Sequence, residues 1–300
     1  MPFTARVQDF GMTMKPFSIR LFKESDIEFA YQTTKSEGWN YAKIDIERMF
    51  KYNPSGCFIA EINDKRVGHV FSVNYGKLGW IGLLIVTAEY RGKSVGTALM
   101  KKAITHLSSS GVETVRLEAV SAIATVYRKL GFVDEYDSLR FSGVSRKFAS
   151  AASSNVKSLK RGMIKEIAEF DAEYFGANRI KVLSSLYHDH PKLCFVSHAG
   201  SKLVGYIMCR KAQKGYRMGP WICNPENPQA ARELLTKCME TIEENAKLYV
   251  GVPAINKKAV EILQDFGFEQ YSRSIRMRFG NELKNERASG IFVIGGPEKG

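Results

Sequence analysis

The segment with the clearest chemical purpose is a short basic turn that joins an apolar run to a helix. It reads Arg91-Gly92-Lys93-Ser94-Val95-Gly96-Thr97. Backbone N–H groups in such a turn point at one spot, and the helix N-terminus adds roughly half a positive charge there. Gly92 and Gly96 lack a Cβ and allow a ligand to come close, while Arg91 and Lys93 supply charge. The turn predicts a pyrophosphate site, although taken alone it is equally typical of a glycine-containing turn that only begins a helix.

Part of the sequence occurs twice. Leu99, Gly131 and Phe132 match Leu235, Gly267 and Phe268 at a spacing of 136 residues, and Pro54, Cys57, Phe58, Val67 and Gly68 match Pro191, Cys194, Phe195, Val204 and Gly205 at 137. Such a repeat indicates two related domains. Within the turn, Arg91, Gly92 and Gly96 become Asn227, Pro228 and Arg232 in the second copy. We therefore expect only the first copy to hold an anion.

The elements that must position this turn follow from the spacing of apolar residues. In the first half, strands are expected at 17–21, 57–62, 67–73, 78–86, 115–120 and from 132, and helices from about 24, at 45–51, from 95 and at 122–130. Asn63, Asp64 and Lys65 predict a tight turn between the second and third strands. The expected order is βααβββαβαβ.

We expect the first domain to span residues 17–143 and a degenerate copy to span 162–280. The stretch 144–161 between them is rich in Ser, Ala and Lys and is interpreted as a linker. Residues 281–300 form a tail, in which 291–294 are apolar enough to add one strand.

The turn, its flanking elements and a downstream segment together resemble the GNAT superfamily of N-acetyltransferases. That segment is Val126-Tyr127-Arg128-Lys129-Leu130-Gly131-Phe132. In this family the turn reads Arg/Gln-x-x-Gly-x-Gly/Ala and the later segment is close to L-Y-x-x-x-G-F. Arg91 and Gly96 match, whereas Ser94 replaces the first glycine. The second half carries an F-G-x-x-R segment at 175–179, as in tandem GNAT proteins. The resemblance implies an α/β (α+β) fold of two tandem GNAT-like domains, each a mixed, mostly antiparallel sheet flanked by helices.

The resemblance also implies acetyl-CoA as co-substrate, bound by the first domain. The binding residues it indicates are Leu84, Ile85, Val86, Arg91, Gly92, Lys93, Ser94, Val95, Gly96 and Thr97. The backbone of residues 84–86 would pair with the pantetheine arm, which requires two parallel strands to separate. No metal is expected, because the five cysteines form no CxxC pair and His188-Asp189-His190 precedes a proline in a loop-like context.

Tyr127 matches the family position that protonates the departing thiolate, and the alternative is that it only packs in the core. The corresponding residue of the second copy is Leu263, which cannot donate a proton. A base is needed as well, since an alkyl amine of pKa ~10.4 is mostly protonated at pH 7. Glu118 and Glu37 are the candidate carboxylates, and a chain of water molecules is the alternative.

Composition argues against a nucleic-acid-binding protein and against a membrane protein. The net charge of +13 divides almost evenly, with 21 Lys+Arg against 15 Asp+Glu in residues 1–150 and 23 against 16 in residues 151–300. Nucleic-acid binding needs clustered phosphate contacts, so it is not favoured. No apolar run reaches the ~18 residues of a membrane span, and residues 1–16 lack the apolar stretch of a signal peptide. A cytoplasmic protein with reduced, buried thiols is expected.

The sequence thus predicts an N-acetyltransferase that moves an acetyl group from acetyl-CoA to a primary amine by direct attack in a ternary complex. A non-catalytic acyl-CoA-binding sensor or scaffold is the alternative. The acceptor is expected to be a small-molecule amine, or else a protein lysine or N-terminal amine. No oligomeric state is predicted.

Overall fold

The computed structural model describes residues 17–148, 155–283 and 286–300, in which one order of elements occurs twice. The first half contains β1 (Ser18–Leu21), α1 (Ile27–Ser36), α2 (Lys43–Tyr52), β2 (Phe58–Ile62), β3 (Lys65–Asn74), β4 (Leu78–Val86), α3 (Val95–Ser109), β5 (Thr114–Val120), α4 (Ala124–Lys129) and β6 (Val133–Val144). The second contains β7 (Val156–Ser158), α5 (Ile164–Phe175), α6 (Ile180–Asp189), β8 (Cys194–Ala199), β9 (Lys202–Lys211), β10 (Tyr216–Cys223), α7 (Pro228–Thr241), β11 (Lys247–Pro253), α8 (Lys257–Asp265), β12 (Glu269–Gly280) and β13 (Ile291–Val293). The predicted order βααβββαβαβ is confirmed, and part of the predicted linker, 149–154, lies outside the described residues.

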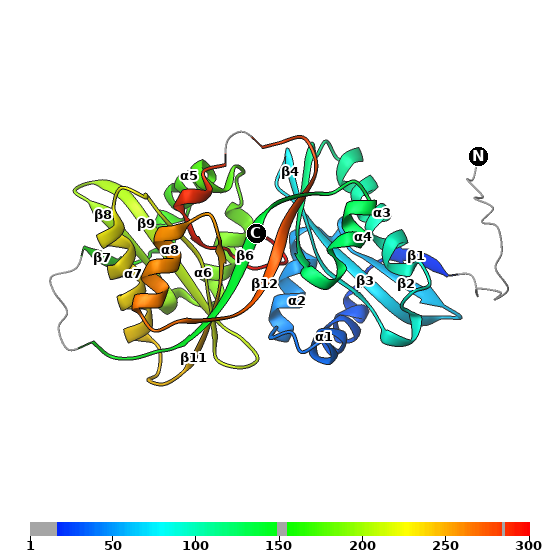
Figure 1. Ribbon diagram of the computed structural model, residues 1–300, viewed down its shortest axis with the longest axis horizontal. Coiled ribbons are helices and arrows are strands. Elements are labelled where there is room, and N and C mark those ends of the chain that lie inside the picture. Colours follow the sequence, from blue (N-terminus) through cyan, green and yellow to red (C-terminus); the bar gives the residue numbers. More distant parts are fainter. Residues whose placement is uncertain (1–16, 149–154, 284–285) are drawn as a thin grey trace.

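The two halves share one sheet by exchanging their last long strands. Its order is β1-β2-β3-β4-β5-β12-β6-β11-β10-β9-β8-β7, with β13 attached to β10. The antiparallel pairs join β12 to β5, β6 to β11, and β6 to β12. Figure 1 shows β6 and β12 crossing the middle of the molecule side by side. Residues 133–144 therefore complete the sheet of the second half, and residues 269–280 that of the first.

Local sequence explains how the first half assembles. Asn63 and Asp64 have φ of 49° and 60°, and Ile62 pairs with Lys65, so β2 and β3 are joined by a two-residue turn with two left-handed residues. On α3, the predicted spacing buries Val95 and Leu99 against the sheet. The five cysteines are free and buried, as expected.

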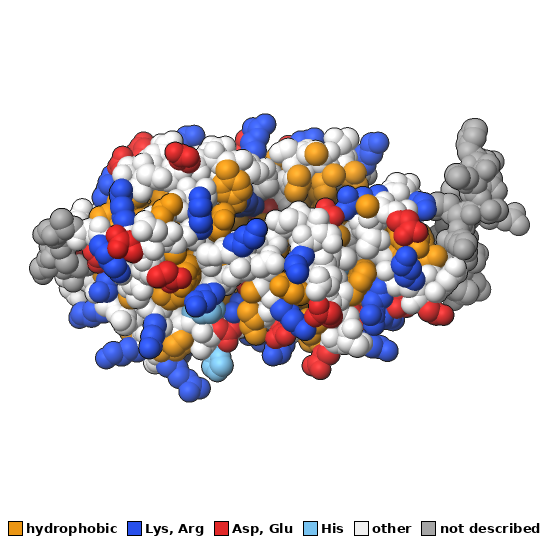
Figure 2. All heavy atoms as spheres, turned by 90° about the horizontal axis from the view of Figure 1, so that it is seen from below, with side chains coloured by type: hydrophobic (Ala, Val, Ile, Leu, Met, Phe, Trp, Pro, Cys, Tyr) orange, Lys and Arg blue, Asp and Glu red, His pale blue; other side chains and the backbone are white. Residues whose placement is uncertain are grey.

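The surface carries charges of both signs. On the face seen in Figure 2, lysine and arginine side chains alternate with acidic ones rather than forming a continuous stripe. Among the described residues, no helix has the length and apolar character needed to cross a bilayer.

Candidate active site

The central feature of the first half is a wedge between the parallel strands β4 and β5. The two strands pair only where Leu78–Trp80 meet Thr114–Arg116, and beyond that point they separate. A bulge at Leu83, whose φ is 49°, shifts the register of β4 against β3 and turns the strand. The edge of β4 over residues 81–86 is thereby left without its β5 partner. Its backbone groups, apart from Val86 O, which accepts from Arg91 Nε, are available to a ligand. Leu84, Ile85 and Val86 lie on this segment.

The basic turn lies directly after that segment. Gly92 and Ser94 adopt left-handed φ of 75° and 59°, so Ser94 takes a conformation that glycine adopts with less strain. The first helical bond of α3 runs from Ala98 N to Ser94 O at 3.0 Å, which leaves the N–H groups of residues 95–97 outside the helical ladder. A Cβ on Gly96 would come within 4 Å of one described side chain, that of Val86, at 3.5 Å. The turn therefore forms an open cradle whose N–H groups and helix N-terminus are suited to an anion.

Arg91 and Glu37 form an ion pair at the rim of this cradle. Arg91 also donates from Nε to Val86 O at 2.9 Å, which ties its side chain to the end of β4. Both side chains are partly exposed. Glu37 is absent from the cavity lining described next, so the structure separates it from the other candidate base, Glu118.

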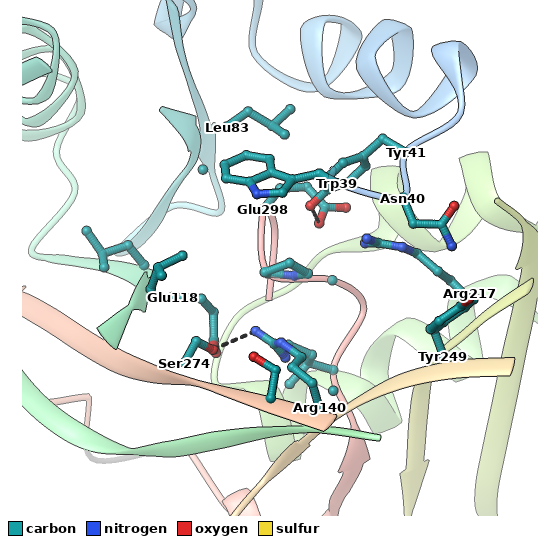
Figure 3. Close-up of a pocket in the computed structure, with 18 of the residues that line it drawn as sticks. Trp39, Asn40, Tyr41, Leu83, Glu118, Arg140, Arg217, Tyr249, Ser274 and Glu298 are labelled. Carbon is teal, nitrogen blue, oxygen red and sulfur yellow. Dashed lines mark hydrogen bonds and ion pairs between the residues drawn. The ribbon is translucent and has the colours of Figure 1, made fainter. Parts of the chain in front are cut away.

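A cavity of about 540 Å³ opens between the two halves. Its walls come from β4, β5 and α4 of the first half, β10 and β11 of the second, the exchanged strands β6 and β12, the loop after α1, and residues 294–298 (Figure 3). Glu118, Tyr127 and Leu84 all line it. The structure thus brings one candidate acid and one candidate base to the wall of the same cavity as the β4 segment.

Tyr127 both packs in the core and lines the cavity, a position compatible with either role that the sequence left open. Its ring packs in the core of the first half, edge-on to Phe132 at 6.0 Å between ring centroids, and its side chain also lines the cavity. Burial raises the pKa of Tyr127 to about 12. The phenol therefore keeps its proton at any physiological pH.

Glu118 is a fully buried carboxylate with one satisfied oxygen. Its Oε2 accepts hydrogen bonds from Arg140 Nη2 at 3.1 Å and Ser274 Oγ at 2.7 Å. Its Oε1 is buried and has no hydrogen-bond partner among the described residues. A buried acceptor without a donor is costly, so this oxygen is suited to an N–H group of a bound molecule. Sequence reasoning missed Arg140 and Ser274, because they lie on the exchanged strands.

Residues 294–298 form one wall of the cavity, and the segment 295–300 is anchored from both halves. Trp80 Nε1 donates to Pro297 O at 2.9 Å, and Arg179 Nη1 donates to Gly300 O at 2.7 Å. Arg179, the arginine of the F-G-x-x-R segment, is fully buried and also forms an ion pair with Asp171 at 2.8 Å. The F-G-x-x-R segment of the second half thus holds the C-terminal wall of the cavity in place.

Within that wall, Glu298 is a buried carboxylate surrounded by cations. Tyr41 Oη donates to its Oε2 at 2.7 Å, and Arg210 and Lys299 form ion pairs with it. Burial alone would raise the pKa of Glu298, but Lys299 and Arg210 lower it to about 2. Glu298 therefore stays ionised and does not compete with Glu118 as a proton acceptor.

The second half has the same wedge, and its own chain fills it. β10 and β11 pair only at Tyr216 and Arg217 before they diverge, and β13 pairs with β10 in the gap. Ile294 N then donates to Gly251 O of β11 at 2.9 Å. β13 thus occupies the place that is open beside β4 in the first half.

The anion turn is also lost in the second half. α7 begins at Pro228, three residues before Ala231, which aligns with Val95 at the start of α3. An additional helical turn therefore replaces the cradle. Arg232, which takes the place of Gly96, is held in an ion pair with Asp265.

Comparisons with known proteins identify the family. A model described as the acetyltransferase (GNAT) family matches residues 22–132, and one described as an acetyltransferase (GNAT) domain matches residues 167–293. Together they span more than half of the chain. The protein belongs to the GNAT family of acyltransferases, in the tandem form predicted from the sequence.

Among its relatives, holothin acyltransferase of Pseudoalteromonas sp. (strain SANK 73390) is 26% identical over 253 residues, which are 84% of each chain. The crystal structure of a putative acetyltransferase from Pyrococcus horikoshii superposes with a TM-score of 0.80 at 23% identity, covering 98% of this chain and 99% of that one. A tandem GNAT protein from the clavulanic acid biosynthesis pathway gives a TM-score of 0.61 at 12% identity, covering 88% and 98%. At such identities the two solved structures support the fold alone.

Proposed function

We propose that this acyltransferase is an N-acetyltransferase that transfers an acetyl group from acetyl-CoA to a primary amine by direct attack in a ternary complex. The observation that carries the proposal is the placement of Glu118 and Tyr127 on one cavity at the open wedge of β4 and β5. The backbone of residues 84–86 would hold the pantetheine arm, and the turn at 91–97 would hold the pyrophosphate. We also propose a cytoplasmic location.

Acetyl-CoA supplies a thioester whose carbonyl carbon accepts the amine nitrogen, so that a C–N bond forms and the C–S bond breaks. Glu118 takes the proton that the amine loses, at the buried Oε1, which has no donor among the described residues. Tyr127 gives its phenolic proton to the departing sulfur. From a phenol of pKa about 12 to a thiolate of solution pKa ~8.5 the transfer is uphill by about 5 kcal/mol, and burial of the sulfur raises its pKa and reduces this difference.

The size and enclosure of the cavity favour a small acceptor over a protein side chain. Both halves and residues 294–298 contribute to its walls, so a folded protein surface would have to reach between them. The curated relative reported above, which matches 84% of this chain, is named for holothin. We therefore propose a small-molecule amine as acceptor.

A thiol-release assay distinguishes the proposed acetyltransferase activity from non-catalytic binding of acyl-CoA. The protein is incubated with acetyl-CoA and a panel of primary amines, and free thiol is followed with a chromogenic disulfide. We expect release that requires both acetyl-CoA and one class of amine, with the acetylated amine as product. Saturable binding of acetyl-CoA without amine-dependent release from any member of a broad panel would favour the sensor.

Glu118→Gln keeps the side-chain shape and the contact with Ser274 but cannot take a proton. We expect kcat to fall about 10- to 10²-fold at pH 7, because water carries part of the proton transfer. The KM for acetyl-CoA should not change. The defect should shrink toward pH 10, where the amine loses its proton without help.

The exposed carboxylate at Glu37 supplies the matched comparison, since Glu37→Gln changes a carboxylate outside the cavity. We expect a loss confined to acetyl-CoA affinity, through its ion pair with Arg91. A larger kcat defect in Glu37→Gln than in Glu118→Gln, with the pH 10 recovery, would assign the base to Glu37 instead.

A further inference from the structure

The cavity is rich in cations on the side contributed by the second half and the exchanged strands. Among the described residues, its lining includes five basic side chains and two carboxylates, Glu118 and Glu298. The basic residues are Arg140, Arg210, Lys214, Arg217 and Arg273. The basic turn at 91–97 is not part of this lining, so these charges are separate from the proposed pyrophosphate site. The cavity therefore has a positive charge that acetyl-CoA bound at that turn would not neutralise.

Three of these cations are already paired. Arg140 binds Glu118 at 3.1 Å, Arg210 binds Asp45 at 3.1 Å, and exposed Arg273 binds Asp137 at 2.8 Å. These pairs neutralise most of the basic lining. Arg217 and Lys214 remain, and among the described residues no carboxylate lies within ion-pair distance of either.

Arg217 is the better placed of these two side chains. It comes from β10, is partly buried, and its guanidinium stacks over the Tyr41 ring at 4.3 Å. Its Nε is buried and donates no hydrogen bond to any residue that the structure describes. Figure 3 shows it beside Tyr249 and Asn40, on the opposite side of the cavity from Glu118. An arginine cannot lose its charge at physiological pH, so this buried, unsatisfied N–H is suited to an anion from outside the protein.

We propose that the acceptor amine carries an anionic group, a carboxylate or a phosphate, which Arg217 binds with help from Lys214 while the amine reaches Glu118. This inference rests on the proposed function and names the class of its acceptor. The planar guanidinium, fixed by Tyr41, would present two N–H groups to such an oxyanion.

Two matched pairs of amines test the proposal, β-alanine with β-alanine amide and phosphoethanolamine with ethanolamine. Wild-type kcat/KM should be at least tenfold higher for the anionic member of one pair or both, and the pair that responds tells carboxylate from phosphate. In Arg217→Gln, kcat/KM for the anionic amine should fall about 10- to 10²-fold, mainly through KM, with little change for its neutral partner.

Arg273→Gln is the matched control, because Arg273 lines the same cavity but is paired with Asp137. It should leave the preference intact. A wild-type enzyme that favours the neutral amines, or an Arg217→Gln variant that loses the same factor on all four, would overturn the proposal while leaving the acetyltransferase function standing.

Calorimetry decides the case in which none of the four amines is acetylated. Phosphoethanolamine and β-alanine are titrated into wild-type protein saturated with CoA. Saturable binding of either one that Arg217→Gln loses and Arg273→Gln keeps supports the anion subsite. No binding of either ligand, or binding that survives in Arg217→Gln, refutes it.

Discussion

Gly96→Glu is expected to abolish acetyl-CoA binding without unfolding the protein. The new Cβ would lie 3.5 Å from Val86, an ordinary contact, and a carboxylate in the first turn of α3 favours the helix by about 0.3–1 kcal/mol. The same carboxylate would fill the cradle and repel the pyrophosphate. In thermal melts, CoA at about 100 times its Kd should raise the wild-type Tm by about 5 °C and leave that of the variant unchanged.

Gly96→Gln distinguishes the effect of side-chain size from that of charge, because glutamine has the size of glutamate without the carboxylate. We expect it to weaken binding less than Gly96→Glu does. An equal CoA-induced shift in Gly96→Glu and wild type would mean that the pyrophosphate binds elsewhere and that the cradle at 91–97 is only a helix start.

Tyr127→Phe is expected to lower kcat by about 10- to 10³-fold, with little change in affinity for acetyl-CoA. The substitution removes only the hydroxyl and retains the ring that packs against Phe132. Because the pKa of Tyr127 is raised to about 12, the phenol is protonated at every pH well below that value. Deprotonation of Tyr127 should therefore not limit the activity of the wild-type enzyme between pH 7 and about pH 10.

Tyr187→Phe supplies a control, since Tyr187 packs in the core of the second half. Its kcat should equal that of wild type. An unchanged kcat in Tyr127→Phe, in an enzyme whose single-turnover rate shows that chemistry limits turnover, would leave Tyr127 a core residue alone.

Much of the fold could be predicted from local patterns. The order of elements, the β2–β3 turn at Asn63-Asp64 and the buried stripe of α3 each depend on residues close in sequence, which apolar spacing and turn chemistry report directly. The turn at 91–97 and the segment around Tyr127 were recognisable for the same reason. Both are continuous in the chain.

The strand exchange could not be predicted in this way. β6 and β12 are copies of one strand, so either has the side-chain pattern to pair with β5 or with β11. Arg140 and Ser274, which hold Glu118, come from these exchanged strands, and Arg217 comes from the other half. Their role depends on contacts between residues more than 20 positions apart, which local patterns do not contain.

The filling of the second wedge also depends on tertiary contacts. The sequence of residues 291–294 predicts a strand but not its partner, and the partner proves to be β10, next to β11. Together with the early start of α7, this contact gives the asymmetry of the repeat a physical basis: one half is open to a ligand and the other is closed by its own chain.

Calorimetric titration with acetyl-CoA tests the central claim, that the first half alone binds it, most directly. We expect one site per chain, lost in Gly96→Glu and unchanged in Arg232→Ala, the substitution at the corresponding position of the second half. Two sites per chain, or binding that persists in Gly96→Glu and disappears only when Arg232 is also changed, would show that the second half is a working acetyl-CoA site and would contradict this account.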